Sequence, residues 1–105
     1  MRVAFTMRLK PGGIDEYRRQ HDNIWPELVA EIKRAGIREF TTFVDDPVLF
    51  LYSEVDDEQA WDRLWHGEVH QRWSEVMSPL MEIDADGIVV SKTMPEIFHI
   101  DHGDS

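Results

Sequence analysis

Two side chains able to transfer protons stand four residues apart in this sequence, Tyr17 and His21. Residues at that spacing lie on one face of a helix, so a phenol and an imidazole can converge on one small molecule. An imidazole has an ordinary pKa of about 6.5 and can therefore both give and take a proton near neutrality. The pair is equally typical of two core residues whose polar atoms are hydrogen-bonded to the backbone. The spacing alone favours neither interpretation.

Tryptophan is frequent for so short a chain, and its four positions are Trp25, Trp61, Trp65 and Trp73. The default role of each indole is packing in the core. The functional alternative is a platform for a sugar, because an indole face stacks on the C–H face of a pyranose. Trp73 is the better candidate for that role, since it stands between Arg72 and Ser74 with Gln71 close by.

Histidine also occurs in two pairs that could suggest a metal site, His66 with His70 and His99 with His102. Neither pair has a third ligand at suitable spacing, and the first lacks the His-Glu-x-x-His order of a zinc protease. The sequence contains no glycine-rich phosphate loop and no Gly-x-Ser-x-Gly nucleophile turn. We therefore expect no metal.

The elements that must position Tyr17 begin with an alternating strand at Val3–Leu9, which Pro11-Gly12-Gly13 ends. A helical stripe with steps of three or four residues follows: Ile14, Tyr17, His21, Trp25, Leu28 and Ile32. Pro26 interrupts it, so the helix is predicted to kink or restart near Ile24 and Trp25. Gly36 is predicted to end it.

Aromatic and β-branched runs at Ile37–Val44 and Val48–Val55 predict an antiparallel hairpin. A second helical region is expected from an N-cap at Asp56 to Met77, with a break at Gly67. Residues 82–93 are predicted to be loop, and Pro95–Ile100 is predicted to be the last strand.

The resulting order, β-α-β-β-α-β, is the ferredoxin-like α+β arrangement. Helices would cover one face of a four-stranded antiparallel sheet and leave the other bare. That bare face would be the one carrying Val3, Phe5, Met7 and Leu9 or its opposite. Because an apolar sheet face does not stay in water, we expect a homodimer, the dimeric α/β barrel.

Composition limits the partners. The 105 residues are the size of one domain, residues 1–105, and their formal charge of −10 disfavours nucleic acid and anionic membranes. A small neutral substrate remains compatible. The chain has no cysteine, no signal-peptide core at its start and no apolar run near the roughly 20 residues that span a bilayer. We expect a cytoplasmic protein.

A longer string carries a family resemblance: Tyr17-Arg-Arg-Gln-His21-Asp-Asn-Ile-Trp25-Pro26-Glu27-Leu28. It resembles the first helix of the L-rhamnose mutarotases, and Gln71-Arg72-Trp73 resembles their second. The resemblance implies a homodimeric, cofactor-free enzyme that interconverts the α and β anomers of a deoxy sugar. It further implies that His21 is the proton donor, that Tyr17 contacts the substrate and that Trp73 lines the sugar site.

The chain departs from this family at the predicted substrate wall. Phe40 stands where relatives carry a tyrosine, and Ser74 stands where they carry a second tryptophan. The segment 81–86 replaces their Asn-Pro-Asp-Asn-Ser-Pro-like loop. The acid is kept while the wall changes, so the sequence favours anomer exchange over specificity for rhamnose. Two other functions stay open: a cofactor-free monooxygenase of the dimeric α/β-barrel kind, and a non-catalytic sugar-binding module.

Overall fold

A four-stranded antiparallel sheet organises the computed structural model, which describes residues 1–102. The last three residues of the expected domain, 103–105, lie outside the described residues. The strands are β1 (Arg2–Arg8), β2 (Ile37–Asp45), β3 (Val48–Val55) and β4 (Ser91–Met94). Their order across the sheet is β2-β3-β1-β4, with every neighbouring pair antiparallel. This is the order of a ferredoxin-like fold, and the predicted α+β class is confirmed.

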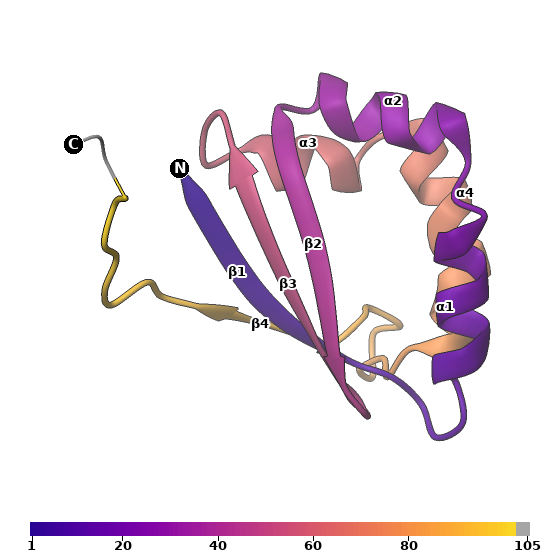
Figure 1. Cartoon of the computed structure of the whole chain (residues 1–105). Helices are drawn as coiled ribbons and strands as arrows, with labels where there is room; N and C mark the ends of the chain where they lie inside the picture. The colour runs from indigo at the N-terminus through magenta and orange to yellow at the C-terminus, as the bar shows by residue number, and fades with distance from the viewer. Residues whose placement is uncertain (103–105) are drawn as a thin grey trace.

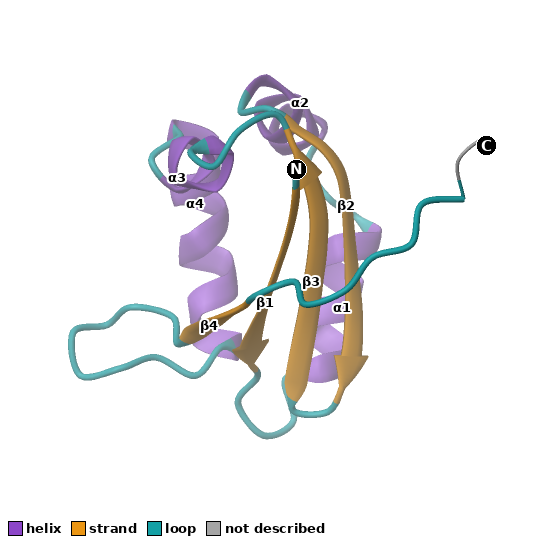
Figure 2. Cartoon of the chain, turned by 90° about the vertical axis from the view of Figure 1, so that its left-hand side faces the viewer, coloured by secondary structure: helices purple, strands orange, loops and turns teal. Residues whose placement is uncertain are grey.

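All helices lie on one side of the sheet (Figure 1). They are α1 (Ile14–Asp22), α2 (Pro26–Arg34), α3 (Ala60–Trp65), α4 (Glu68–Met77) and a short 3₁₀ turn, η1 (Ser78–Leu80). Figure 2 shows the opposite face of the sheet toward the viewer, where only the C-terminal segment crosses in front of the strands. The fold therefore has two layers, with one sheet face covered by helices.

Proline divides the first helical stripe as the sequence predicts. Pro26 is the first residue of α2, where a missing N–H costs no helical hydrogen bond. The chain does not kink through it but ends α1 at Asp22 and restarts, so Tyr17 and Leu28 lie on separate helices. Gly36 follows α2 with a φ of +96°, a left-handed conformation that favours glycine.

The helix-facing side of the sheet carries the alternating apolar residues. Phe5, Met7 and Leu9 are buried from the first strand, and Leu49 and Leu51 are buried from β3. Of the two faces that the sequence left open, the one with Val3, Phe5, Met7 and Leu9 is therefore covered by helices. The opposite side of the sheet is the exposed one.

Two predicted boundaries are wrong. The last strand is Ser91–Met94, which pairs with β1, and residues 95–100 form no strand. β4 is a short edge strand with mostly exposed side chains, so no apolar alternation marks it. The third helix starts at Ala60 with Gln59 as its N-cap and not after Asp56, whose carboxylate accepts a hydrogen bond from Arg38.

Candidate active site

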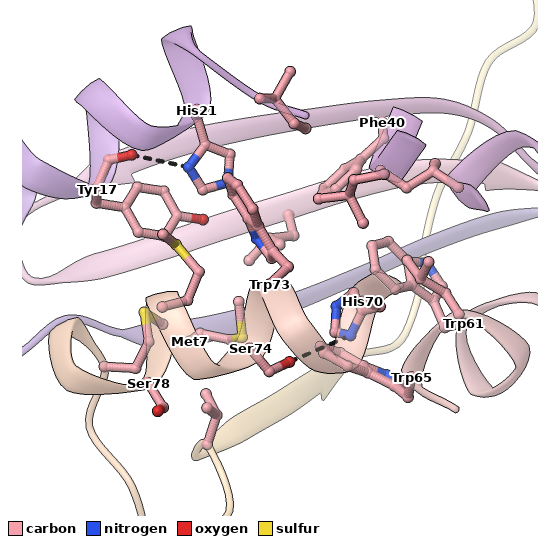
Figure 3. A pocket seen from close by; sticks show the side chains of 18 residues that line it. Met7, Tyr17, His21, Phe40, Trp61, Trp65, His70, Trp73, Ser74 and Ser78 are labelled. Atoms are coloured by element: carbon pink, nitrogen blue, oxygen red, sulfur yellow. Dashed lines mark hydrogen bonds between the residues drawn. The ribbon is translucent and has the colours of Figure 1, made fainter. Parts of the chain in front are cut away.

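A pocket lies between the helix layer and the sheet and holds about 670 Å³ of space free of atoms, part of it open to solvent. The cavity volume that a water-sized molecule can occupy is about 90 Å³, which is smaller than that of a typical site for a drug-sized ligand. Five residues singled out from the sequence all line it: Tyr17, His21, Phe40, Trp73 and Ser74. Figure 3 shows their side chains around the pocket. The structure therefore brings together residues that are up to 57 positions apart in the chain, from Tyr17 to Ser74.

The first wall comes from α1. Nδ1 of His21 lies 2.9 Å from the backbone oxygen of Tyr17, one turn earlier. A carbonyl oxygen only accepts hydrogen bonds, so Nδ1 carries the proton and Nε2 holds the lone pair of the neutral ring. The Tyr17 ring stacks on the imidazole with centroids 4.2 Å apart and an interplanar angle of 27°. These two contacts fix both the tautomer and the orientation of His21.

The protonation states of this wall follow from burial. Burial lowers the pKa of His21, opposed by the hydrogen bond to the Tyr17 carbonyl and by the charge of Asp22. Burial raises the pKa of Tyr17 to about 12. Near neutrality Tyr17 therefore stays a hydroxyl, which can donate a hydrogen bond, and His21 is mostly neutral. A His21 imidazolium, when it forms, is a stronger acid than free histidine.

Trp73 fills the space between α1 and α4. Its ring meets His21 edge to face at 5.2 Å and meets Trp25 in the same way at 5.1 Å. Only 6% of its surface is exposed. The two roles that the sequence offered for this indole therefore coincide, since it packs in the core and also lines the pocket.

Phe40 stands on the sheet side of the pocket. Its ring meets Trp61 edge to face at 4.9 Å, and the Trp61 indole donates from Nε1 to Ser53 Oγ at 2.8 Å. The polar atom of Trp61 is thus already bonded inside the protein. With a phenylalanine at position 40, this part of the pocket offers a substrate mainly apolar surface.

The second wall comes from α4 and contains a residue that sequence reasoning missed. His70 is only 7% exposed, lines the pocket and has its Nδ1 3.3 Å from Ser74 Oγ. Its ring meets Trp65 edge to face at 4.5 Å. The sequence analysis paired His70 with His66, whose side chain is 75% exposed. The signal that identifies His70 is its spacing of three and seven residues from the buried Trp73 and Met77.

The pKa of His70 shifts for the same reason as that of His21. Burial lowers it, and the charge of Glu31 opposes the shift.

Within residues 1–102, no group of three or more histidine, cysteine, aspartate or glutamate side chains is arranged to hold a metal ion. No helix in that part of the chain is long and apolar enough to cross a membrane. Among the groups that line the pocket, the side chains of Tyr17 and Ser74 can form hydrogen bonds and the imidazoles of His21 and His70 can transfer protons.

Comparison with known proteins gives one family. A family model described as L-rhamnose mutarotase matches residues 2–100. The L-rhamnose mutarotase of Oceanobacillus iheyensis is 37% identical over 102 residues, which cover 95% of this chain and 98% of that protein. The crystal structure of an L-rhamnose mutarotase from Formosa agariphila superposes with a TM-score of 0.83 at 30% identity, covering 96% of this chain and 99% of that one.

A more distant structure shares the fold alone. A dimeric ferredoxin-like protein from an uncultured marine organism is 9% identical, covers 98% of this chain and 97% of its own, and superposes with a TM-score of 0.61. The near-complete matches, by contrast, confirm the resemblance carried by the string from Tyr17 to Leu28. On this evidence the chain belongs to the L-rhamnose mutarotase family.

Proposed function

We propose that this chain is a sugar mutarotase, an isomerase that interconverts the α and β anomers of a deoxy sugar such as L-rhamnose without a cofactor. The observation that carries the proposal is His21, whose Nδ1 is bound to the Tyr17 carbonyl while Nε2 is left for a substrate in the pocket. The near-full-length relatives named L-rhamnose mutarotase support the same chemistry.

Mutarotation needs one proton to leave the anomeric hydroxyl and one to reach the ring oxygen. The C1–O5 bond then breaks, the open aldehyde rotates about C1–C2, and the ring closes on the other face of the carbonyl. His21 donates from Nε2 to the ring oxygen during opening, and it does so as the imidazolium, because Nε2 of the neutral ring carries only a lone pair. Closure is the reverse of opening, so His21 takes that proton back when the hydroxyl attacks the carbonyl. A positioned acid–base group of this kind typically contributes ~10²–10⁴-fold.

The other predicted residues bind the sugar. The Tyr17 hydroxyl has no hydrogen-bond partner among the described residues and stays protonated, so it orients a sugar hydroxyl. Trp73 presents aromatic surface beside His21. Phe40 and Ser74 shape the wall where relatives carry larger or more polar side chains, and they set which sugar is preferred.

Exchange NMR tests the function directly. The α and β signals of L-rhamnose, L-fucose and related sugars are followed with and without catalytic amounts of protein. We expect faster exchange for at least one deoxy sugar, unchanged by a chelator. Saturation transfer from protein to sugar without faster exchange would indicate a binding module. Oxygen uptake with a quinol and no effect on sugars would indicate a monooxygenase.

The proposed working form is a homodimer of single domains, residues 1–105. The sheet face away from the helices exposes Phe43 at 62% and Phe50 at 38%, and the C-terminal segment exposes Ile97 at 93% and Phe98 at 75%. Apolar surface of this kind is removed from water when two sheets pack together. The dimeric ferredoxin-like neighbour supports this arrangement. Sedimentation equilibrium at micromolar concentration should give the dimer mass, and a monomer would contradict it.

The proposed partners are limited to a small neutral sugar and the second copy of the chain. The net charge of −10 acts against phosphorylated ligands, nucleic acid and anionic membranes. A chain without cysteine also suits the reducing cytoplasm, which we propose as its compartment.

A further inference from the structure

The pocket contains two imidazoles on separate walls, and the mechanism above uses only one of them. His21 comes from α1 and His70 comes from α4, and both line the same space (Figure 3). Ring opening moves two protons, one at the anomeric hydroxyl and one at the ring oxygen. If His21 serves the ring oxygen, a second group is needed to exchange a proton with the anomeric hydroxyl.

In both imidazoles, Nδ1 faces an oxygen that lies four residues away on the same helix. Nδ1 of His21 donates to the Tyr17 carbonyl, and Nδ1 of His70 lies 3.3 Å from Ser74 Oγ, an oxygen able to accept. In that tautomer Nε2 of His70 carries a lone pair. Within the described part of the chain, no fully buried side-chain nitrogen or oxygen lacks a hydrogen-bond partner. Nε2 of His70 has no such partner, so it remains accessible from the pocket.

A carboxylate from another helix fixes the place of His70. Glu31 on α2 accepts hydrogen bonds from the backbone N–H of His70 at 2.7 Å and of Val69 at 3.2 Å. The residue before α4 is Gly67, and a Cβ there would lie 2.3 Å from Glu31 Oε1. The glycine thus leaves room for the carboxylate to cap α4, and the cap sets the depth at which His70 enters the pocket.

Few other groups in this pocket can exchange a proton near neutrality. The titratable residues that line it are Tyr17, His21 and His70. Tyr17 keeps its proton because its pKa is raised to about 12. The charged groups that act on the two imidazoles are Asp22, next to His21, and Glu31, at the start of α4. His70 is therefore the remaining side chain suited to the second proton.

We propose that His70 is a second catalytic residue, which contacts the anomeric hydroxyl of the bound sugar through Nε2. This inference rests on the proposed mutarotase function. In ring opening His70 takes the hydroxyl proton, the O1–C1 bond becomes a carbonyl, C1–O5 breaks, and His21 protonates O5. In closure His21 takes the O5 proton, O5 attacks C1, and His70 returns its proton to O1. Each imidazole ends in its starting state, and no oxidant or further reactant is needed.

A pH profile tests this role. If His21 must be protonated and His70 neutral, kcat for anomer exchange falls on both sides of an optimum. His70→Gln keeps a hydrogen-bonding side chain without titration, so it should lower kcat by roughly 10²-fold or more and abolish the acidic limb. The matched control is His66→Gln, one turn earlier and exposed, which should keep the wild-type rate and both limbs.

Ser74→Ala is a second test of the His70 role if the His70→Gln variant fails to fold. It removes only the oxygen beside Nδ1, so kcat should fall several-fold and the acidic limb should move, while thermal unfolding stays close to that of the wild type. A folded His70→Gln protein with wild-type kcat and both limbs would overturn the His70 role and leave the mutarotase function standing. Wild-type protein that accelerates exchange of no sugar would overturn the function, and this role with it.

Discussion

The two walls of the pocket hold their histidines by different means. On α1, His21 is anchored to the carbonyl of Tyr17 in its own preceding turn. On α4, the backbone of His70 is anchored by Glu31, which comes from a different helix 39 residues earlier. The first anchor forms as soon as its helix forms. The second exists only when α2 and α4 are docked on each other.

The position of His21 is therefore set by local structure, and the position of His70 is set by tertiary structure. A wall built from one helical turn tolerates changes elsewhere, because its geometry follows from the helix itself. A wall set by an inter-helix cap is sensitive to any change in how the helices pack. The departures from the family pattern lie on or opposite the second wall, at Ser74 and Phe40. The predictions below test whether the walls are independent in this sense.

The largest effect is expected at His21. His21→Ala should slow enzyme-catalysed anomer exchange by roughly two to four orders of magnitude, because it removes the group that protonates the ring oxygen. Tyr17→Phe keeps the stacked ring and removes only the hydroxyl, so it should cost only a few-fold. Exchange NMR with thermal unfolding on the same samples measures both. A folded His21→Ala protein with a near-wild-type rate of anomer exchange would rule out this mechanism.

The next largest effect is on stability and concerns the cap of α4. Glu31→Ala should lower the free energy of unfolding by about 1–2 kcal/mol, since two backbone N–H groups lose a charged acceptor. Glu27 provides a matched control, because it lies one turn earlier on α2 and forms only an exposed, 3.5 Å pair with Arg72. Glu27→Ala should change stability by no more than about 0.5 kcal/mol. Equal losses in urea unfolding would show that Glu31 is not a cap.

A smaller effect is expected on sugar preference. Phe40→Tyr with Ser74→Trp introduces the hydroxyl and the indole that the family resemblance implies at these two lining positions. A hydrogen bond is worth about 0.5–1.5 kcal/mol, which shifts relative rates several-fold. The double variant should therefore move preference toward L-rhamnose in a panel of deoxy sugars. Unchanged relative rates across the panel would show that neither position contacts the substrate.

The same division explains what could be read from the sequence. The placement of Tyr17 and His21 on one wall was predictable, because residues four apart lie on one face of a helix. The restart at Pro26 was predictable because proline lacks an N–H. The β-α-β-β-α-β order followed from apolar periodicity, which reports which face of each element is buried.

What the sequence did not supply depends on packing between elements. The sequence offered His70 only as a weak metal-ligand candidate beside His66, because the contact of α4 with Glu31 on α2 is a tertiary one that helical spacing does not report. The last strand was misplaced because β4 is held by backbone pairing with β1, while the apolar residues that suggested a strand lie exposed in 95–100. Backbone pairing at a sheet edge leaves no side-chain pattern to read.

The smallest expected effect is on stability in mild acid, and it compares the two walls once more. Burial lowers the pKa of both His21 and His70, so the folded protein binds fewer protons than the unfolded chain below the ordinary histidine pKa of about 6.5. Stability should therefore fall as pH drops from about 6.5 toward the folded values of these groups. The stability that these two neutral histidines contribute should be fully present above a pH of about 6.5.

Other groups also bind protons differently in the folded and unfolded chains, so the contribution of one histidine is isolated by difference. The pKa of Glu39 is raised by its neighbour Glu54, which acts in the opposite direction. Urea unfolding of wild type, His70→Gln and His66→Gln is therefore compared across the same pH range. His70→Gln should lose less stability on acidification than the wild type, because one buried group no longer has to take up a proton. His66→Gln serves as the control for replacing a histidine outside the pocket, since the side chain of His66 is 75% exposed. If His70→Gln and the wild type had the same pH dependence, His70 would titrate alike in the folded and unfolded chains, and its burial in the second wall would have no electrostatic consequence.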